Sequence, residues 1–502
     1  MHIHSFDLAI VIVYLLAVTA LGMHFRRKQS QIAQIAGEDR NAVTREYFLG
    51  GRLAPWWALA FSIVATETST LTIIGTPAIA YGGNLTFLQL IFGYLIGRVL
   101  IVLVLLPGYF RGDFFTAYAL IEKRFGTHMR AVAASTFLIT RALAEGVRVS
   151  AIAIVLSVVL GTSEHLSVVI VIALTLLYTR EGGMKAVIWT DVAQLFIYLA
   201  GSAAAFFVLL HRIPGGWSEF VQVAATHGHK LQLFDFSFNL ATKYTFWSGL
   251  IGGAFLTMAT HGTDQTIVQR LLAARNQRDS RRALLASGVI VLFQFTVFLL
   301  IGVLLFVFAQ HTPLLSAGER TDRILPLFLL REMPTGLAGL LLASIIAVAM
   351  SNASGSLNSL AASSVLDFSA LRLGNRKPAN DAGFLRLSRR MTLFWGLVLM
   401  GFGLVTWGPV LEAGLTIASL PFGSLLGLFL LGTLNRRSNA AGALAGMFAG
   451  LITILCVWRL TNIAFTWYVL IGSITTFLVG SLVSLSTGRG ESKKHHATLD
   501  PA

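Results

Sequence analysis

The sequence predicts an all-α polytopic membrane protein with about thirteen transmembrane helices. Of its 502 residues, 55% are hydrophobic and only 12% are charged, whereas a soluble domain carries about 25% charged residues. The mean hydropathy is +0.74, and apolar runs recur along almost the whole chain. These observations exclude a soluble enzyme, a disordered scaffold and a disulfide-stapled secreted domain, since Cys456 has no partner cysteine.

The predicted spans follow from the thickness of the bilayer. A membrane helix needs about 20 apolar residues, because each residue advances about 1.5 Å across a core of about 30 Å. The first span has no basic stretch before it and is followed by Arg26, Arg27 and Lys28, which predicts an anchoring helix and not a cleaved signal peptide. The spans are expected at residues 5–24, 55–81, 84–110, 131–160, 165–179, 186–211, 246–263, 284–309, 335–364, 391–407, 410–433, 439–457 and 464–486.

The basic residues predict the orientation of these spans. With loops on alternating sides, 28 of the 38 Lys and Arg residues fall on one side, with clusters at 270–282 and 372–390. Basic residues favour the cytoplasmic side. We therefore expect the N-terminus outside and the C-terminus inside, in the cell (inner) membrane. The net charge of +15 is then a topology signal, and nucleic-acid binding is not predicted.

Two spans combine hydroxyl groups with features that break helices. Residues 66–70 contain four hydroxyl residues around Glu67, and Gly75-Thr76-Pro77 follows, where we expect a break. In the span at 335–364, Ser351 and Ser354 share a face. Hydroxyls and backbone carbonyls freed at a break suit sodium, a hard cation that prefers oxygen ligands. The alternative is that these hydroxyls bond to their own helices or allow close helix packing.

Charged residues within the spans have more than one interpretation. Glu67 could act in coupling or gating, or be a structural partner. Arg148 could bind a substrate carboxylate, or pair with Glu145 one turn earlier. Arg98 could pair with another helix, and Asp191 could bind a second ion or cap a helix.

Motifs for catalysis and for transition-metal binding are absent from the sequence. It has no Cys/His set with metal-ligand spacing, no P-loop and no Gly-x-Ser-x-Gly element, and its twelve histidines are scattered. We expect no transition-metal site, no organic cofactor and no enzymatic activity.

One segment resembles a known family signature. Residues 180–194, which read Arg-Glu-Gly-Gly-Met-Lys-Ala-Val-Ile-Trp-Thr-Asp-Val-Ala-Gln, resemble that of the sodium:solute symporters. Residues 62–75 and 347–359 are similar to the first and eighth core helices of that family, and residues 262–270 to the inner end of the sixth. The resemblance covers about residues 45–435 and implies a LeuT-type fold, in which two inverted five-helix repeats surround a midplane site.

On this basis the chain divides into six parts. The glycines at 252, 253 and 262 are expected to mark discontinuities in the second repeat. The parts are an extra helix and inner loop at 1–54, the first repeat at 55–211, an outer loop at 212–245, the second repeat at 246–435, two final helices at 436–487 and a disordered cytoplasmic tail at 488–502.

The resemblance implies sodium as the coupling ion. Its main site would use backbone oxygens of Ala65, Thr68 and Val348 and the side chains of Ser351 and Asn352. Asn352 stands where the family more often has a hydroxyl residue, although an amide oxygen can still ligate sodium.

A second ion site is implied at Asp191 and Ser354, together with Ser351. Gly355 lacks the side-chain oxygen of the expected serine, so we predict one sodium per cycle. Thr260 lies where sugar-transporting relatives have an aromatic gate, which argues against a closely similar sugar. The implied substrate-binding candidates are Thr70, Gln89, Arg148, Thr257, Thr260, His261 and Phe422.

The predicted function is sodium-coupled import of a small organic solute by alternating access, and the solute is expected to bear a carboxylate if Arg148 faces the cavity. One alternative is a proton-coupled transporter of the same fold, with Glu67 or Asp191 as the carrier. Others are a solute sensor that does not transport and a passive channel.

Overall fold

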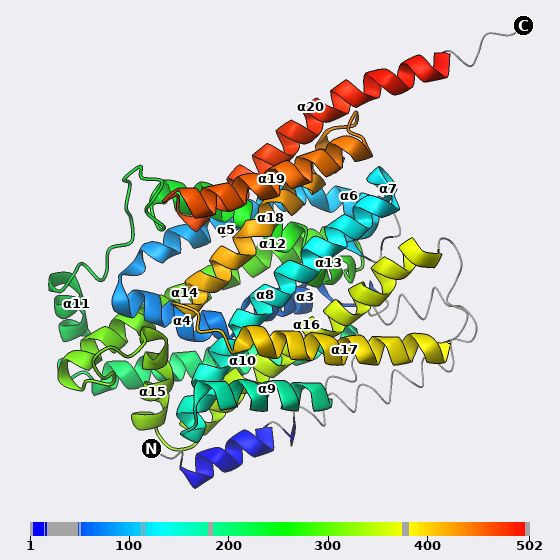
Figure 1. Ribbon diagram of the computed structural model, residues 1–502. Coiled ribbons are helices and arrows are strands. Elements are labelled where there is room, and N and C mark those ends of the chain that lie inside the picture. Colours follow the sequence, from blue (N-terminus) through cyan, green and yellow to red (C-terminus); the bar gives the residue numbers. More distant parts are fainter. Residues whose placement is uncertain are drawn as a thin grey trace, which may run out of the picture.

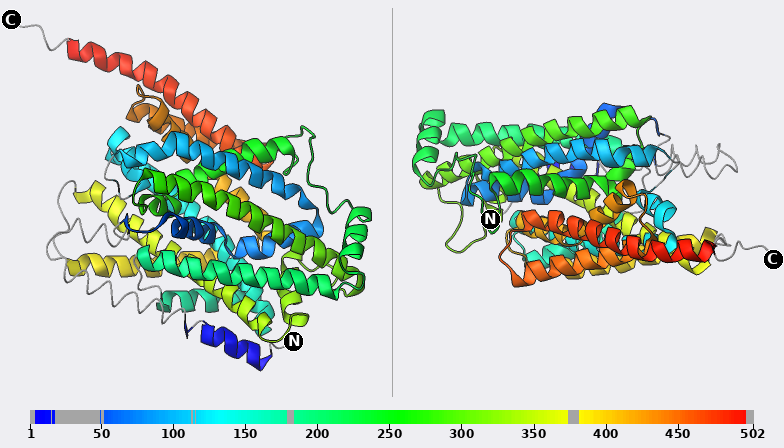
Figure 2. Two further views of the ribbon diagram at one scale, coloured as in Figure 1. Left: turned by 180° about the vertical axis from the view of Figure 1, so that it is seen from behind. Right: turned by 90° about the horizontal axis from the view of Figure 1, so that it is seen from above.

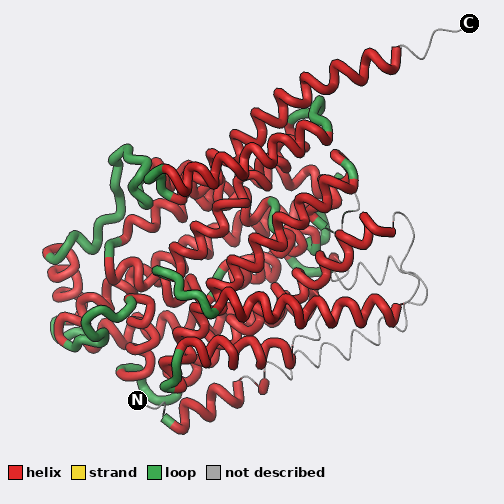
Figure 3. The backbone as a smooth tube through the Cα atoms, in the orientation of Figure 1, coloured by secondary structure: helices red, strands yellow, loops and turns green. Residues whose placement is uncertain are grey.

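The computed structural model is helical throughout the part of the chain that it describes, apart from loops and one isolated bridge between Ala54 and Ala274 (Figures 1 and 3). The described residues are 4–14, 16–17, 49, 52–111, 114, 116–178, 184–373 and 381–496. In both views of Figure 2, α19 and α20 run side by side along one edge of the bundle, and the end of α20 projects beyond it.

Helices lie in the described parts of all the predicted spans. The helices are Ser5–Tyr14, α3 (Trp56–Glu67), α4 (Thr70–Gly82), α5 (Leu88–Leu100), η3 (Ile101–Leu105), α6 (Leu106–Phe110), α7 (Ala117–Phe125), α8 (Thr127–Leu160), α9 (Glu164–Tyr178), α10 (Met184–Arg212), α11 (Gly216–Thr226), η4 (Ser248–Gly252), α12 (Gly253–Gly262), α13 (Gln265–Leu272), α14 (Gln277–His311), α15 (Ile324–Arg331), α16 (Leu337–Leu373), α17 (Asp381–Gly403), α18 (Val410–Leu434), α19 (Ala440–Leu460) and α20 (Tyr468–His496), with single 3-10 turns at Leu85–Phe87, Thr321–Arg323 and Phe465–Trp467. The short helices α7, α11, α13 and α15 lie between spans.

The all-helical membrane class is confirmed. Among the described residues, eight helices are long and apolar enough to cross a membrane, or nine if the bent pair α3–α4 is one span. The other predicted spans correspond to shorter helices or, at 246–263, to η4 followed by α12. The number thirteen and the orientation stay predictions.

The helix break expected at Gly75-Thr76-Pro77 is wrong. The chain bends by 65° between α3 and α4, at Thr68 and Ser69, and Pro77 lies inside α4. Thr68 and Ser69 are extended, and the Ser69 backbone N–H donates to Thr72 Oγ1 at 3.4 Å as part of a capping box. The hydroxyl residues therefore decide where the helix stops, because their side chains satisfy the backbone of a new helix start.

Two further expectations differ from the structure. Helix α16 runs without a break through the serine-rich stretch at 351–359, and earlier in the same helix the Ser344 hydroxyl bonds to Leu341 O at 2.8 Å. Helix α20 continues to His496, so residues 488–496 are helical and not disordered, whereas residues 497–502 lie outside the described part.

The discontinuity expected near Gly262 is present: α12 ends there, and Asp264 caps α13 by accepting from Thr266 N at 2.7 Å. Gly252 is the last residue of the π-helical turn η4 and Gly253 is the first residue of α12, so the backbone there stays helical but changes its hydrogen-bond pattern.

Two segments, one before η4 and one before α15, are bonded to the first turn of α18. Asp322 Oδ2 accepts hydrogen bonds from the Val410 backbone N at 3.3 Å and from Arg320 Nη2 at 3.2 Å. Glu412 accepts from Lys243 Nζ at 2.6 Å and from the Tyr244 hydroxyl at 2.9 Å. Carboxylates suit this position because the first N–H groups of a helix have no partner within the helix.

Burial raises the pKa of Asp322, and this predicts a pH dependence of stability. Since the folded-state pKa lies above the unfolded value of about 3.9, the folded protein binds this proton more tightly. The stability that this group contributes is present in full below the unfolded pKa and is lost as pH rises through the folded pKa. An Asp322→Asn variant keeps the acceptor for Val410 and should lack this step in a plot of melting temperature against pH. Parallel curves for the two proteins would contradict the assignment.

Candidate functional site

A cavity of about 140 Å³ lies beside the break between α3 and α4. Its walls come from both sides of the break and from α5, α8, α12, α13, α14 and α18. The polar residues that line it are Thr66, Glu67, Ser69, Thr72, Thr140, Arg141, Arg148, Thr260, His261, Asp264 and Thr266. The aromatic residues that line it are Phe87, Tyr94, Phe137, Phe295 and Phe422.

Four of the seven substrate-binding candidates line this cavity: Arg148, Thr260, His261 and Phe422. The other three are buried but are not among the described residues that line the cavity. Gln89 donates to Thr86 O at 3.2 Å and Tyr244 O at 3.1 Å and accepts from Asp235 N at 3.1 Å, so it ties a loop to α5.

Thr257 and Thr70 are the remaining two. Thr257 is fully buried and packs against Gly97 of α5. Thr70 is 1% exposed and is the first residue of α4. Neither lines the cavity among the described residues.

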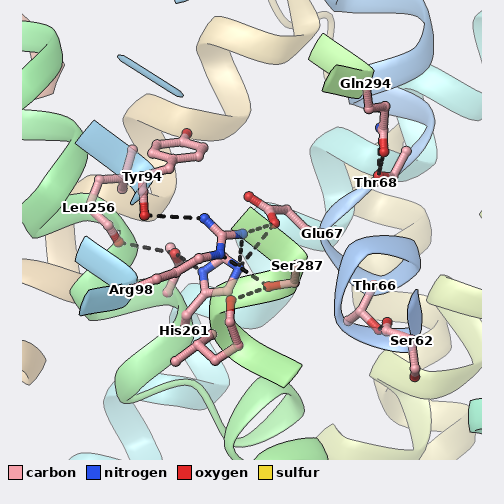
Figure 4. Close-up of polar contacts among 12 residues, drawn as sticks. Ser62, Thr66, Glu67, Thr68, Tyr94, Arg98, Leu256, His261, Ser287 and Gln294 are labelled. Atoms are coloured by element: carbon pink, nitrogen blue, oxygen red, sulfur yellow. Dashed lines mark hydrogen bonds and ion pairs between the residues drawn. The ribbon is translucent and has the colours of Figure 1, made fainter. Parts of the chain in front are cut away.

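Arg98 connects four elements beside the cavity (Figure 4). Its guanidinium forms an ion pair with Glu67 on α3, donates to Ser287 Oγ on α14 at 3.2 Å, and donates to the backbone O of Tyr94 on α5 at 3.3 Å. His261 Nε2 on α12 lies 3.3 Å from Arg98 Nη2 and 3.2 Å from Glu67 Oε2. The expectation that Arg98 pairs with another helix is therefore confirmed.

A second ion pair joins Asp191 on α10 to Arg270 on α13. Arg270 Nη2 lies 2.9 Å from Asp191 Oδ2, and Arg270 Nε donates to Ser62 Oγ at 2.9 Å. The Ser62 hydroxyl donates to the same Asp191 oxygen at 2.6 Å. The structure thus gives Asp191 an internal cation as its partner, and the second ion site at Asp191 and Ser354 stays a prediction.

A third cluster centres on Glu145, which is fully buried on α8. Arg148 Nη1 lies 3.0 Å from Glu145 Oε2, and the Ser356 hydroxyl of α16 donates to that oxygen at 2.7 Å. Arg141 Nη2 lies 3.6 Å from Glu145 Oε2, and Arg141 Nη1 lies 3.9 Å from Asp264 Oδ2. Arg148 therefore pairs with Glu145 and also lines the cavity, and its binding of a substrate carboxylate stays a prediction.

Arg141 and Asp264 are cavity residues that were not among the sequence candidates. A signal for Arg141 was present, because residues 141, 145 and 148 are spaced at i, i+4 and i+7 and share one helix face. No local signal places Asp264 beside α8, since that contact arises only in the folded protein.

The predicted sodium ligands lie on two elements. Ala65 and Thr68 are at the end of α3, where the Ser69 N–H that would reach Ala65 O in a continuous helix bonds to Thr72 Oγ1 instead. Thr68 Oγ1 is hydrogen-bonded to the side chain of Gln294 on α14. Val348 and Asn352 lie on α16, and Asn352 Nδ2 is buried without a partner.

Ser351 also lies on α16, but its side chain is outside the part of the chain that the structure describes. Among the described residues, no group of three or more His, Cys, Asp and Glu side chains is placed to hold a metal ion.

Comparisons with known proteins identify the family of this chain. A family model described as the sodium:solute symporter family matches residues 47–450. The sodium/sialic acid symporter SiaT of Proteus mirabilis is 28% identical over 96% of each chain. The human sodium/iodide cotransporter is 30% identical over 90% of this chain and 69% of that protein.

A solved structure agrees with these matches. It is a substrate-bound outward-open state of a Na⁺-coupled sialic acid symporter, with a TM-score of 0.81 at 27% identity over 95% of this chain and 97% of that one. Because the family model covers most of the sequence and the fold agrees along nearly its whole length, the chain belongs to the sodium:solute symporter family, with its LeuT-type fold.

Proposed function

We propose that this protein imports a small carboxylate-bearing organic solute, coupled to sodium, across the cell (inner) membrane. The observation that carries the proposal is the cavity at the broken helix, with two guanidinium groups of α8, Arg141 and Arg148, in its wall. Guanidinium groups bind carboxylates through paired N–H donors. Arg148 Nε is buried without a partner, so this side chain keeps a free donor although Nη1 is bonded to Glu145.

Sodium would bind where α3 ends. The proposed ligands are the backbone oxygens of Ala65, Thr68 and Val348 with the side chains of Ser351 and Asn352, and the repeats would occupy residues 55–211 and 246–435. An ion that joins α3 to α16 would stabilise an outward-open state and pre-organise the adjacent cavity. Because such coupling is reciprocal, bound solute would also tighten sodium binding.

The proton-coupled alternative requires Glu67 or Asp191 to carry the proton. Each of these carboxylates already has an arginine counter-ion, Arg98 and Arg270 respectively. Protonating either one would leave a buried guanidinium without its anion, which is costly. This pairing favours sodium over the proton as the coupling ion.

The test is thermal stability of the purified protein against a panel of solutes, first in sodium and then with choline in its place. The panel contains N-acetylneuraminate, because sialic acid symporters are among the relatives, together with lactate, proline, glucose and biotin. A carboxylate that raises the melting temperature only in sodium supports the proposal, since a ligand of the folded state stabilises it. If pH changes the response and sodium does not, the proton-coupled alternative is favoured.

Ser351→Ala is expected to weaken the sodium response about tenfold in apparent affinity, because a charged group loses one oxygen ligand. Ser344→Ala is the matched control on the same helix, since the Ser344 hydroxyl is bonded to Leu341 O. The measurement is the sodium concentration that gives half of the maximal thermal stabilisation. Equal shifts in the two variants would argue against Ser351 as a ligand.

A further inference from the structure

The two carboxylate oxygens of Glu67 have different surroundings. Oε2 is held by Arg98 and lies beside His261, whereas Oε1 is buried and has no hydrogen-bond partner (Figure 4). The residue lines the cavity and its side chain is 10% exposed. A buried carboxylate oxygen without a donor is unfavourable, so such an oxygen next to a cavity is placed to accept a hydrogen bond from a bound molecule.

The orientation of Glu67 is fixed by its partner. The Arg98 side chain is 1% exposed and is anchored by Ser287 Oγ on α14 and by Tyr94 O on its own helix. Because an arginine can only donate, one Glu67 oxygen must face it. The contacts of Arg98 and His261 both go to Oε2, which leaves Oε1 without a partner in a residue that lines the cavity.

The charges around the cavity indicate which donor fits. With histidine counted as neutral, the described charged residues that line the cavity or pair directly with its lining are three carboxylates and three guanidiniums: Glu67, Glu145 and Asp264 against Arg98, Arg141 and Arg148. One sodium ion and one carboxylate solute keep this balance. A hydroxyl donor adds no charge, whereas an ammonium group would leave an uncompensated positive charge in a buried site.

We propose that Glu67 Oε1 accepts a hydrogen bond from a hydroxyl group of the solute, so that the transported carboxylate is a hydroxy acid. This inference rests on the proposed function, in which the arginines of α8 bind the carboxylate. It gives Glu67 a role in selecting the solute, beyond the coupling or gating role expected from the sequence.

The first test needs no variant. Sodium-dependent thermal stabilisation is titrated with lactate, propionate, 2-methoxypropionate and alanine, and with N-acetylneuraminate and its monodeoxy and mono-O-methyl analogues. The loss of one hydroxyl, or its methylation, should weaken binding about tenfold or more, because the buried acceptor is left without a donor. Alanine should bind at least about tenfold more weakly than lactate. If the deoxy and O-methyl acids bind as well as the hydroxy acids, the inference is overturned.

The second test uses Glu67→Gln. The amide oxygen can still accept a hydrogen bond from Arg98, and this contact turns the NH₂ group toward the cavity. The variant should therefore lose the preference for the hydroxyl and bind the methyl ethers at least as well as the hydroxy acids. Glu122→Gln is the matched control, since Glu122 on α7 pairs with Arg130 at 2.7 Å and does not line the cavity. A hydroxyl preference that persists unchanged in Glu67→Gln overturns the inference.

The two proposals fail in different ways. Acids that bind only in sodium but show no preference for a hydroxyl contradict the role of Glu67 and leave the symport of a carboxylate intact. If no acid in either series binds in a sodium-dependent manner, the proposed carboxylate class is itself contradicted, and the role of Glu67 with it. If Glu67→Gln does not fold, the wild-type titrations decide the question.

Discussion

Arg98→Met is expected to lower the free energy of unfolding by about 3–5 kcal/mol, because it leaves Glu67 buried and without its counter-ion. Arg98 is 1% exposed and connects α3, α5 and α14, so its loss also leaves Ser287 and the Tyr94 carbonyl without this donor. The measurement is thermal unfolding of the purified protein in detergent, in sodium and without solute.

A double variant separates the charge from the packing. Glu67→Gln combined with Arg98→Met removes the uncompensated carboxylate, so a substantial part of the loss should be recovered. Arg130→Met is the matched control, because Arg130 pairs with Glu122 where the two side chains are 19% and 31% exposed. Such a pair contributes about 0–1 kcal/mol. A loss of equal size in Arg98→Met and Arg130→Met would contradict the buried role of Arg98.

Local chemistry explains which parts of this arrangement could be predicted from the sequence. The Glu145–Arg148 pair was among the expectations because residues three apart meet on one helix face. The partner of Arg98 could not be identified, since Glu67 is 31 residues away and the two meet only when α3 and α5 both pack against α14. For the same reason, the contact between Asp191 and Arg270, 79 residues apart, has no sequence signal.

The position of the helix break shows a different limit. Proline and glycine are the usual breakers, and the expectation at Gly75-Thr76-Pro77 followed that rule. The break occurs instead at Thr68 and Ser69, where Ser69 and Thr72 form a capping box. That pattern was visible in the sequence, whereas the tolerance for Pro77 depends on neighbouring helices. Gly302 of α14 packs so closely that a Cβ there would lie 2.2 Å from the Pro77 carbonyl oxygen.

Gly93→Ala is expected to destabilise the protein by about 1–3 kcal/mol, although alanine favours helix formation, because overpacking outweighs that gain. A Cβ at Gly93 would lie 2.2 Å from Gly249 O and 2.9 Å from Ala254 N, and backbone atoms cannot move aside as a flexible side chain can. Helix α5 would have to separate from η4 and α12. Thermal unfolding measures the loss.

The matched control for this substitution is Gly401→Ala. Gly401 also lies inside a helix, α17, but a Cβ there would meet nothing within 4 Å, so alanine should be neutral or stabilise by up to about 1 kcal/mol. Equal effects in the two variants would contradict the close approach of α5 and α12.

The separation of α5 from α12 in Gly93→Ala should also affect the cavity, because Arg98 lies on α5 and His261 on α12. A wider spacing between the two helices should move these two side chains apart and weaken their contacts with the Glu67 carboxylate. Gly93→Ala should therefore reduce the hydroxyl preference together with the stability, whereas Gly401→Ala should change neither in that direction.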